Sequence, residues 1–423
     1  MSDRRFGAGT KRLGPAFDLL AAYQPGGFFF ERSGTGVSGT GVAHRVRSEG
    51  GPGRIERLAA RASSAMATIR LDTAAVTPVA VGAIPFDDDR PAELLVPARV
   101  IRRTRSGETW QVDIWPDGLA PADVDRSRWT GRTVPHEPFT EIQLRSDPEP
   151  EDYGRAVAQA TRRIGAGEFR KVVLARTIVV DAGRALDPKQ LLWRLRAVDP
   201  DCYAFAAPEV DLTNHLGDPS VLVGATPELL VAKSGKDLRA TPLAGSAPRF
   251  SDPAEDRGSA RRLFESAKER EEHALVSEYV AAALGPLCEE LEYPKEPELL
   301  GTANVWHLAT PFRGRPRPSV ASVLEVVATL HPTPAVCGTP RDAALRALED
   351  LESIDRGCYA GPVGWVDANG DGEWAIALRC AEITGATARL FAGAGIVRDS
   401  VPGLELDETE RKFRALLDSL RWG

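Results

Sequence analysis

The clearest helical pattern in the chain begins near Asp152. Tyr153, Val157, Ala160 and Ile164 recur at a spacing of three to four residues, which places them on one face of a helix. The GAG sequence that follows has little side-chain bulk and is typical of residues that end a helix. The pattern therefore predicts an amphipathic helix that buries this face and stops before residue 168.

A run rich in β-branched residues, EFRKVVLARTIVV at 168–180, follows directly and predicts a long strand. Alternation divides this strand into two faces. One face is predicted to carry Lys171, Val173, Ala175, Thr177 and Val179. Because the rest of the strand is largely apolar, Lys171 is a candidate for a poorly solvated pocket.

The first third of the chain has weaker patterns. The elements expected there are a frayed terminus at 1–12, a short helix at 16–23, and strands at 27–32, 75–86 and 93–115. A run rich in Pro, Asp and Arg at 116–148 then interrupts the alternation. We therefore predict two subdomains, one at 1–147 and one at 148–423.

Later segments carry turn signals between apolar runs. Residues 220–235 are expected to form a hairpin or two strands around a turn, since Pro227 cannot donate inside a central ladder. Residues 365–383 contain Asn369-Gly370, the strongest short hairpin signal in the chain. Helices are expected at 254–285 and in the last segment, where Leu406, Phe413, Leu416, Leu417 and Leu420 repeat at helical spacing. Together these elements predict an α+β fold of one domain with two subdomains, in which helices flank large antiparallel sheets.

Composition narrows the class of partner. The chain has 423 residues, 43% hydrophobic and 27% charged, which suffices for a large core. A net charge of −7 argues against a general nucleic-acid or anionic-membrane partner and favours a small molecule. No run reaches the roughly 18 apolar residues of a membrane span, and no apolar segment follows the basic start. A cytoplasmic protein is expected.

The five cysteines form no CxxC motif and lie singly among apolar residues. They are expected to be packed thiols rather than disulfides or zinc ligands.

Two pairs of glutamates form the most distinctive charge pattern. Glu269 and Glu272 lie in KEREEH, and Glu405 and Glu408 lie in ELDET. Residues at i and i+3 share a helix face, so each pair would direct two carboxylates the same way. If two such helices face one another, a hard divalent cation with oxygen ligands would relieve the repulsion. A single pair is more often a solvated helix face, so the metal interpretation depends on its context.

Two local motifs do not support a function. Gly34, Gly36 and Gly39 match GxGxxG, but further glycines follow instead of an amphipathic helix. The segment that begins at Asp367 matches the opening of an EF-hand loop, but Leu378 stands where a bidentate glutamate is required. Both motifs are predicted to be turns.

Eight segments resemble, in order and spacing, the chorismate-utilising enzymes. This family includes isochorismate synthases, salicylate synthases, anthranilate synthase large subunits and aminodeoxychorismate synthases. The resemblance makes residues 148–423 a chorismate-binding catalytic region, while the N-terminal part, with YQPGGFFFER, looks like the variable front part of isochorismate synthases. The eight segments are FRKVVLAR (169–176), GATPELLV (224–231), TPLAGS (241–246), KEREEH (268–273), VWHLAT (305–310), LHPTPAVCGTP (330–340), DRGCYAGPVGW (355–365) and GAGIVRDSVPGLELDET (393–409).

The resemblance implies a Mg²⁺ ion held by Glu272 and Glu408 and coordinated to the ring carboxylate of chorismate. Glu269 and Glu405 would contact metal-bound water. This division agrees with the general behaviour of Mg²⁺, which keeps several waters and takes only one or two protein carboxylates.

The resemblance also implies the two catalytic residues. Lys171 would activate water for attack on C2 of the ring, and burial would favour the neutral amine that this role needs. Glu228, in TPELL, would protonate the departing C4 hydroxyl, and burial would help it to keep its proton. Without such pockets, Lys171 would be an ion-pair partner and Glu228 a surface turn residue.

The remaining positions implied by the resemblance would bind the substrate. Arg379 and Tyr359 match positions that hold the enolpyruvyl carboxylate, which suits the fork of an arginine. The backbone N–H groups of Gly393, Ala394 and Gly395 can approach an oxyanion closely because the segment has little side-chain bulk. The other expected contacts are Gly245, Ser246, Thr310, Lys412 and His307, which alone would be a core histidine.

Two positions distinguish branches of the family. Ala244 stands where aminodeoxychorismate synthases carry a nucleophilic lysine, and Lys171 stands where ammonia-using members lack the base. Ser246 departs from the usual threonine but keeps the hydroxyl. Water is therefore the expected nucleophile, and no glutaminase subunit is expected.

The sequence thus predicts a Mg²⁺-dependent isochorismate synthase, an isomerase also called chorismate hydroxymutase, that is a monomer and serves siderophore or menaquinone biosynthesis. Three alternatives stay open: a salicylate synthase that also eliminates pyruvate, a non-catalytic homologue that binds a metabolite, and an ammonia-dependent enzyme of the anthranilate branch.

Overall fold

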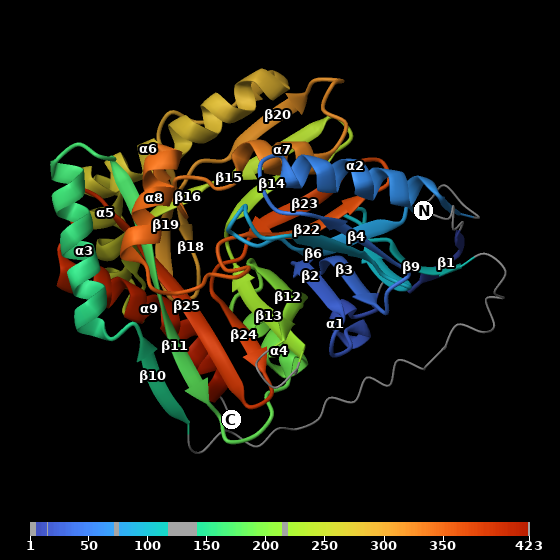
Figure 1. Ribbon diagram of the computed structural model, residues 1–423, viewed down its shortest axis with the longest axis horizontal. Helices are drawn as coiled ribbons and strands as arrows, with labels where there is room; N and C mark the ends of the chain where they lie inside the picture. The colour runs from blue at the N-terminus through green and yellow to red at the C-terminus, as the bar shows by residue number, and fades with distance from the viewer. Residues whose placement is uncertain (1–5, 15, 72–75, 117–141, 214–218, 422–423) are drawn as a thin grey trace.

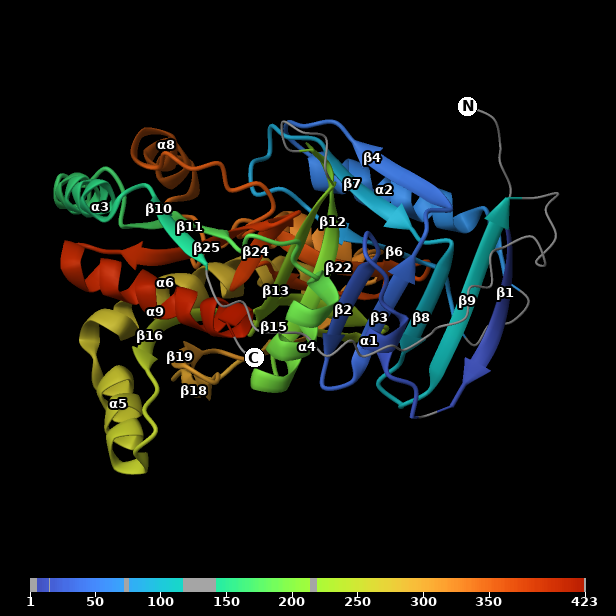
Figure 2. The same cartoon turned by 90° about the horizontal axis from the view of Figure 1, so that it is seen from below.

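The computed structural model describes residues 6–14, 16–71, 76–116, 142–213 and 219–421. Within these residues, two large sheets and one small sheet form the framework, and helices cover their faces (Figures 1 and 2). Nearly all strand pairs are antiparallel; the described exception is the pairing of β1 with β5. The predicted α+β class is confirmed.

The largest sheet has thirteen of the described strands and draws on both halves of the chain. In order across the sheet these are β10 (Gln143–Asp147), β11 (Lys171–Asp181), β25 (Thr387–Ile396), β24 (Cys380–Thr384), β13 (Pro219–Thr226), β12 (Tyr203–Thr213), β2 (Phe28–Arg32), β3 (Thr35–Thr40), β8 (Arg99–Arg103), β9 (Thr109–Pro116), β1 (Phe6–Leu13) and β5 (Ile69–Arg70), and β21 (Gly338–Thr339) pairs with β11.

The second sheet has nine of the described strands, and a three-stranded sheet lies beside it. The order in the second sheet is β17 (Cys288–Glu292), β20 (Phe312–Pro316), β15 (Asp237–Thr241), β14 (Leu229–Ser234), β23 (Gly372–Ile376), β22 (Pro362–Asp367), β6 (Val79–Ala83), β7 (Ala92–Val96) and β4 (His44–Ser48). The small sheet consists of β16 (Leu243–Pro248), β19 (Val305–Ala309) and β18 (Glu298–Gly301).

Both large sheets join strands from the two sides of residue 147, since β12 pairs with β2 and β22 pairs with β6. The division at residue 147 stays a prediction, and most of the run that suggested it lies outside the described residues.

The helices pack on the faces and ends of these sheets (Figure 1). They are α1 (Leu19–Ala22), α2 (Arg54–Ala67), α3 (Pro150–Gly165), α4 (Pro188–Val198), α5 (Pro253–Glu265), α6 (Ala267–Leu284), the 3₁₀ turn Gly285–Leu287, α7 (Val323–Leu330), α8 (Arg341–Leu351) and α9 (Pro402–Arg421). In α3 the buried side chains are the four that the sequence pattern predicted. None of the helices in the described part of the chain is long and apolar enough to cross a membrane.

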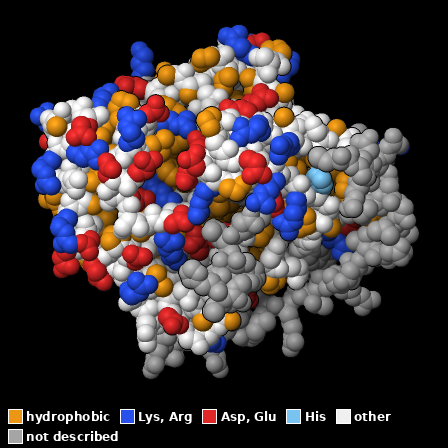
Figure 3. Space-filling view, in the orientation of Figure 1, with side chains coloured by type: hydrophobic (Ala, Val, Ile, Leu, Met, Phe, Trp, Pro, Cys, Tyr) orange, Lys and Arg blue, Asp and Glu red, His pale blue; other side chains and the backbone are white. Residues whose placement is uncertain are grey.

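Side chains of β2 show how both faces of the largest sheet are buried. Phe28 and Phe30 belong to the larger core, which also contains residues of the second sheet, whereas Phe29 belongs to a smaller core with residues of α1, α4 and α9. The five cysteines are buried free thiols, as expected. On the face seen in Figure 3, Lys and Arg side chains are interspersed with Asp and Glu, so no extended surface of one sign covers it.

One sequence-based expectation was wrong, and two were confirmed in part. Residues 6–13 are not frayed but form β1, which pairs with β9 over its whole length. The expected helix at 254–285 is two helices, because Ser266 ends α5 and its Oγ caps α6 by accepting from Glu269 N at 3.3 Å. The two strands expected around Pro227 exist, but they are not paired with each other: β13 lies in the largest sheet and β14 in the second.

The two hairpin turns are confirmed. Asn369-Gly370 joins β22 to β23, and the GxGxxG segment lies in the β2–β3 hairpin, where Gly34 adopts φ 79°. The helix α2 has no counterpart among the expected elements.

The chain crosses between the two large sheets twice at one place. Residues 227–228 connect β13 to β14, and residues 377–379 connect β23 back to β24. The two crossings are joined by hydrogen bonds, from Ala225 N to Arg379 O at 3.2 Å and from Ile376 N to Glu228 O at 3.1 Å. Strands that change sheets form the corners of packed sheets, and this corner carries both Glu228 and Arg379.

Candidate active site

A cavity lies at the corner where the two sheets separate. Eleven of the sixteen residues that the sequence marked for function line it: Glu228, Gly245, Ser246, Glu272, His307, Tyr359, Arg379, Gly393, Gly395, Glu408 and Lys412. The other five do not line it; they are Lys171, Glu269, Thr310, Ala394 and Glu405. Ala244, the position that distinguishes a branch of the resemblance, is also in the wall.

The two acidic pairs do lie on helices, α6 and α9, and the two helices face one another at the cavity. Lys268, at the start of α6, bridges them: its Nζ is 2.9 Å from Glu405 Oε1 on α9 and 3.9 Å from Glu269 Oε1. Glu272 and Glu408 line the cavity, whereas Glu269 and Glu405 do not. The structure therefore brings the four carboxylates together and separates them into an inner and an outer pair.

Burial and neighbouring charges shift the pKa values of Glu269, Glu405 and Glu408 in different directions. Burial raises the pKa of Glu269 to about 7, and the carboxylates of Glu272 and Glu408 add to the rise. Burial likewise raises the pKa of Glu405, with a contribution from Glu408. For Glu408, burial acts in the same direction but is outweighed by Lys412, whose Nζ lies 2.6 Å away, so its pKa is lowered. The cluster thus holds more negative charge than its lysines neutralise.

The donor set fits a hard cation. All four acidic groups offer oxygen atoms, which Mg²⁺ prefers, and Mg²⁺ needs only one or two of them because waters and substrate supply the rest. Among the described residues, no three His, Cys, Asp or Glu side chains are already gathered around one point. Glu272 and Glu408 in the wall are therefore the groups that could hold the ion together with oxygens from outside the chain.

Lys171 is fully buried on β11, as its strand pattern predicted. Its Nζ lies 3.0 Å from Glu272 Oε1, a distance typical of an ion pair, but the angles do not satisfy a hydrogen bond to any group in the described part of the chain. The side chain passes beneath Gly395, where an added Cβ would lie 3.1 Å from Lys171 Cε. Lys171 is thus packed against both the acidic cluster and the glycine segment.

Glu228 is the most strongly perturbed carboxyl in the cavity wall. It is 3% exposed. Burial raises its pKa to about 8, although a hydrogen bond from the backbone of Leu243 and the charges of Lys171 and Lys412 act against the rise. Glu228 therefore holds its proton at neutral pH, which is the state that a general acid requires.

Arg379 and His307 form a polar edge of the cavity. Arg379 Nη2 lies 3.4 Å from His307 Nε2. Burial, together with the charges of Arg379 and Lys412, holds the pKa of His307 well below its ordinary value. The ring is therefore neutral, and because a guanidinium can only donate, Nε2 accepts and Nδ1 carries the proton.

Tyr359 also lines the cavity. Its ring stacks on Phe391 with centroids 4.9 Å apart and planes 11° apart. This stacking fixes the direction of the phenol, so its position is set by packing rather than by solvent.

The glycine segment of β25 offers two backbone N–H groups rather than three. Val173 and Ala175, which stand opposite Gly395 and Gly393, direct their own N–H groups to Cys337 O and Glu352, away from β25. Antiparallel ladders alternate, so both glycines direct their backbone groups away from β11; Lys412 Nζ accordingly donates to Gly393 O at 2.7 Å. Ala394 departs from the expectation, because its position in the ladder directs its N–H to β11.

Comparison with known proteins identifies the family. The family model described as "Chorismate binding enzyme" matches residues 15–421. The chain belongs to this family. Isochorismate synthase DhbC of Bacillus subtilis (strain 168) is 38% identical over 402 residues, which cover 95% of each chain. The resemblance drawn from the eight segments is confirmed.

Solved structures agree with this assignment. The crystal structure of DhbC from Bacillus anthracis matches with a TM-score of 0.81 and 34% identity, over 95% of this chain and 98% of the other. MenF, the menaquinone-specific isochorismate synthase from Escherichia coli, also has a TM-score of 0.81, over 99% of this chain and 95% of the other. At 23% identity it supports the fold alone.

Sequence reasoning missed several residues of this chorismate-binding enzyme's site. Phe391 lines the cavity, and the alternation of β25, which puts it on the face of Gly393 and Gly395, could have revealed it. Lys268 and His273 flank the acidic pair in KEREEH. His273 Nε2 lies 2.7 Å from Thr310 Oγ1, and burial lowers its pKa to about 4. No pattern in the sequence predicts this contact, which joins α6 to the end of β19.

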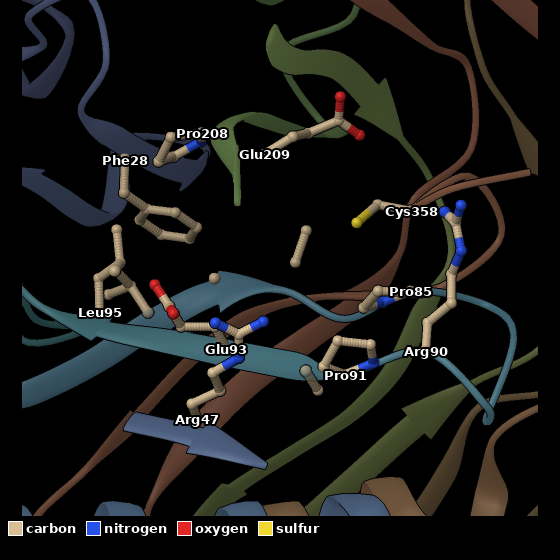
Figure 4. Close-up of a pocket in the computed structure, with 14 residues that line it drawn as sticks. Phe28, Arg47, Pro85, Arg90, Pro91, Glu93, Leu95, Pro208, Glu209 and Cys358 are labelled. Carbon is tan, nitrogen blue, oxygen red and sulfur yellow. The ribbon is translucent and has the colours of Figure 1, made fainter. Parts of the chain in front are cut away.

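A second cavity lies beside the first in this chorismate-binding enzyme (Figure 4). Its wall is mainly apolar, with Phe28, Leu95 and several prolines, and its charged residues are largely paired, as Arg90 with Asp355 at 2.8 Å. Cys358 lines this cavity and the next residue, Tyr359, lines the first. The described wall of the second cavity contains no lysine and no pair of acidic helices, so the first cavity is the candidate active site.

Substitution of Gly395 by alanine is expected to disable the site while leaving the fold intact. The new Cβ would lie 2.1 Å from Glu272 Oε1, at the far end of a flexible side chain that can move. Displacing a metal-binding group or its support typically lowers metal affinity or activity about 10- to 100-fold. Gly165→Ala is the control, because nothing lies within 4 Å of its added Cβ. Equal turnover and Mg²⁺ requirement in the two variants would contradict this view of Glu272.

Proposed function

We propose that the chain is an isochorismate synthase that converts chorismate to isochorismate. Water adds a hydroxyl group at C2, the ring double bonds shift, and the C4 hydroxyl leaves with a proton as water. The reaction is an isomerisation with no net gain or loss of atoms. No glutaminase subunit is needed, since water is the nucleophile.

The observation that carries the proposal is the proton held by Glu228 in the cavity wall, together with the buried Lys171, which lies behind that wall against Glu272 and Gly395. A leaving hydroxyl needs a proton donor, and Glu228 is protonated at neutral pH because burial raises its pKa to about 8. Attack by water needs a proton acceptor, and Lys171 is the candidate. Its side chain is fully buried, and its Nζ lies 3.0 Å from Glu272 Oε1.

Substrate recognition follows from the cavity wall. The guanidinium of Arg379 can take the enolpyruvyl carboxylate in a bidentate hydrogen bond, with Tyr359 beside it. Neutral His307 faces the same space. The two free N–H groups of Gly393 and Gly395 can donate to a substrate oxygen.

Mg²⁺ would be held by Glu272 and Glu408, with Glu269 and Glu405 behind them through water. The ion would neutralise the ring carboxylate of chorismate and fix its orientation. Each side chain of the inner pair now contacts a lysine, so the pair is already directed toward positive charge.

Removal of divalent metal is expected to lower turnover by about 100-fold or more, with recovery on adding Mg²⁺. Glu272→Gln should raise the Mg²⁺ concentration needed for half-maximal rate and weaken Mg²⁺ binding measured by calorimetry. Glu271→Gln is the matched control, since Glu271 is the exposed neighbour on the same helix. Full activity after treatment with chelator would rule out the metal.

The test of the proposed function is product analysis. Purified protein with chorismate and Mg²⁺ should form isochorismate, resolved by chromatography and mass spectrometry. Salicylate with pyruvate would assign a salicylate synthase instead, and an aminated product on adding ammonium would assign the anthranilate branch. Binding of chorismate without turnover would assign a non-catalytic homologue.

We further propose the cellular setting. The protein would act in the cytoplasm as a monomer, with a variable subdomain at 1–147 and the chorismate-binding region at 148–423. Its product would enter siderophore or menaquinone biosynthesis, and the likeness to isochorismate synthase DhbC and, at 32% identity, to isochorismate synthase MenF of Bacillus subtilis (strain 168) leaves both routes in the proposal.

A further inference from the structure

Strand β11 is incomplete on one edge, and the gap lies in the wall of the cavity. On that edge, β21 pairs with residues 171–172 and β10 pairs with residues 177–181. On this edge, residues 173–176 have no strand neighbour in the described part of the chain, whereas on the other edge they pair with β25. Val173 lines the cavity. Because buried backbone groups must be hydrogen-bonded, the gap needs partners from elsewhere.

A buried ion pair supplies them. Arg356 Nη2 donates to Val173 O at 2.7 Å, and Glu352 Oε2 accepts from Ala175 N at 2.9 Å. The two side chains are also bound to each other, at 2.6 Å through Nε and at 2.8 Å through Nη2. Together they provide the donor and the acceptor that an adjacent strand would have provided.

Arg356 also holds two further segments of the cavity wall, one through its guanidinium and one through its backbone. Arg356 Nη1 donates to Val336 O at 2.8 Å, and the backbone carbonyl of Arg356 accepts from Tyr359 N at 2.8 Å. Val336 and Tyr359 both line the cavity, whereas Arg356 and Glu352 do not. Arg356 is 6% exposed, with the ring of Phe86 4.4 Å from its Cζ. Arg356, a residue outside the cavity, therefore connects three segments that form it, two through its guanidinium and one through its backbone.

We propose that the Arg356–Glu352 pair is a positioning device for the reaction, which fixes β11 and the Tyr359 turn relative to each other. The proposal rests on the proposed function, because it assigns the pair to the placement of Lys171, two residues before Val173, and of Tyr359. Neither charged group touches the substrate. A shift of about 1 Å in a reacting group can lower the rate about 100-fold, so the pair acts on turnover through the residues that it holds.

The experiment must separate position from stability. Removing only Arg356 would leave Glu352 buried and unpaired, which strongly destabilises a protein. The double variant Arg356→Met, Glu352→Leu removes both charges and keeps similar volume, and such replacements are often neutral for stability. It cannot, however, supply hydrogen bonds to Val173 O and Ala175 N. The matched control is Arg99→Met, Asp113→Leu, which removes an ion pair of 2.5 Å between β8 and β9, strands that contribute no residue to the cavity.

The double variant is expected to stay folded with a lower Tm, because Val173 O and Ala175 N lose their partners, and to lose about 10- to 100-fold in kcat at temperatures well below that Tm, with a smaller change in KM. Amide hydrogen exchange in the peptide that covers residues 171–177 should become faster, whereas the control variant changes neither kcat nor this exchange. The single variant Glu352→Gln should keep part of the exchange protection that the double variant loses at residues 171–177, since its amide oxygen can still accept from Ala175 N.

Two results would overturn the proposal: unchanged exchange at 171–177 in the double variant, or faster exchange with an unchanged kcat. A loss of kcat of the same size in the control would overturn it too. The exchange measurement needs no substrate. If the wild type made no isochorismate, the proposed function would fail by itself, while exchange at 171–177 would still decide whether the pair holds β11.

Discussion

Lys171→Met is expected to lower kcat for isochorismate formation by about 10²- to 10⁴-fold, the range that a general base contributes. Lys171 is the only lysine on β11, and its Nζ is buried beside the cavity. Methionine keeps the apolar stem and removes the amine, so packing beneath Gly395 should be retained. The proposed substrate contacts at Arg379 and Tyr359 are untouched, so KM should change far less than kcat. Steady-state kinetics with isochorismate quantified directly provides the measurement.

A second lysine offers a matched control for this substitution. Lys233 on β14 is 8% exposed, and its Nζ lies 2.8 Å from Asp371 Oδ1, so it too is a buried lysine paired with a carboxylate. Lys233→Met should leave kcat near that of the wild type even if it lowers Tm. If Lys171→Met kept more than about a tenth of the wild-type kcat, the contribution of a general base would be missing, and the assignment of Lys171 would be wrong.

Local patterns predicted the elements whose signals are complete within a few residues. The helix α3 and the strand β11 were predicted because their apolar faces are continuous, and the acidic pairs were placed on helices by spacing alone. The strand β1 was missed because its sequence, FGAGTKRL, has little apolar alternation and is ordered by pairing with β9, about a hundred residues later. For residues 220–235 the sequence left a hairpin and two strands around a turn open for the same reason: Pro227 marks an interruption, but only the partner strands decide that β13 and β14 enter different sheets.

Local patterns likewise predicted only part of the candidate site. Spacing placed Glu269 with Glu272 and Glu405 with Glu408, but the lysine that bridges the two helices, Lys268, depends on how α6 meets α9. Likewise, the presence of small residues at 393–395 was readable, but which of their N–H groups stay free depends on the register with β11. That register is a property of the two paired strands, and the contacts of β11 with Glu352 and Cys337 on its other edge are likewise contained in no local pattern.

Glu228→Gln is expected to lower kcat by about 10²- to 10⁴-fold, because an amide keeps the shape of the carboxyl group but cannot give a proton to the leaving hydroxyl. The wild-type rate should also report this group. Burial raises the pKa of Glu228 to about 8, so the acid form predominates at neutral pH and falls tenfold for each pH unit above that value. In a pH–rate profile, kcat should decline above about pH 8, and this decline should be absent from the variant.

The pH dependence of folding stability reports on the protonation of Glu228 independently of the reaction rate. The pKa of Glu228 is raised in the folded protein above its ordinary value of 4.5, so the folded state binds this proton more tightly. The resulting stability is fully present below about pH 4.5 and is lost as pH rises through about 8. Relative to the wild type, Glu228→Gln should therefore gain in Tm between pH 6 and 9.

The control for Glu228→Gln is Glu31→Gln. Burial also raises the pKa of Glu31, but this carboxyl lies on β2, pairs with Arg196 at 3.2 Å and does not line the cavity. The control should keep the wild-type kcat and its decline above pH 8. If Glu228→Gln instead kept both the rate and the alkaline decline, another group would donate the proton and the carboxyl would only fill the corner between the two sheets. Loss of the rate together with a gain in alkaline stability is the result expected only of a buried acid that reacts.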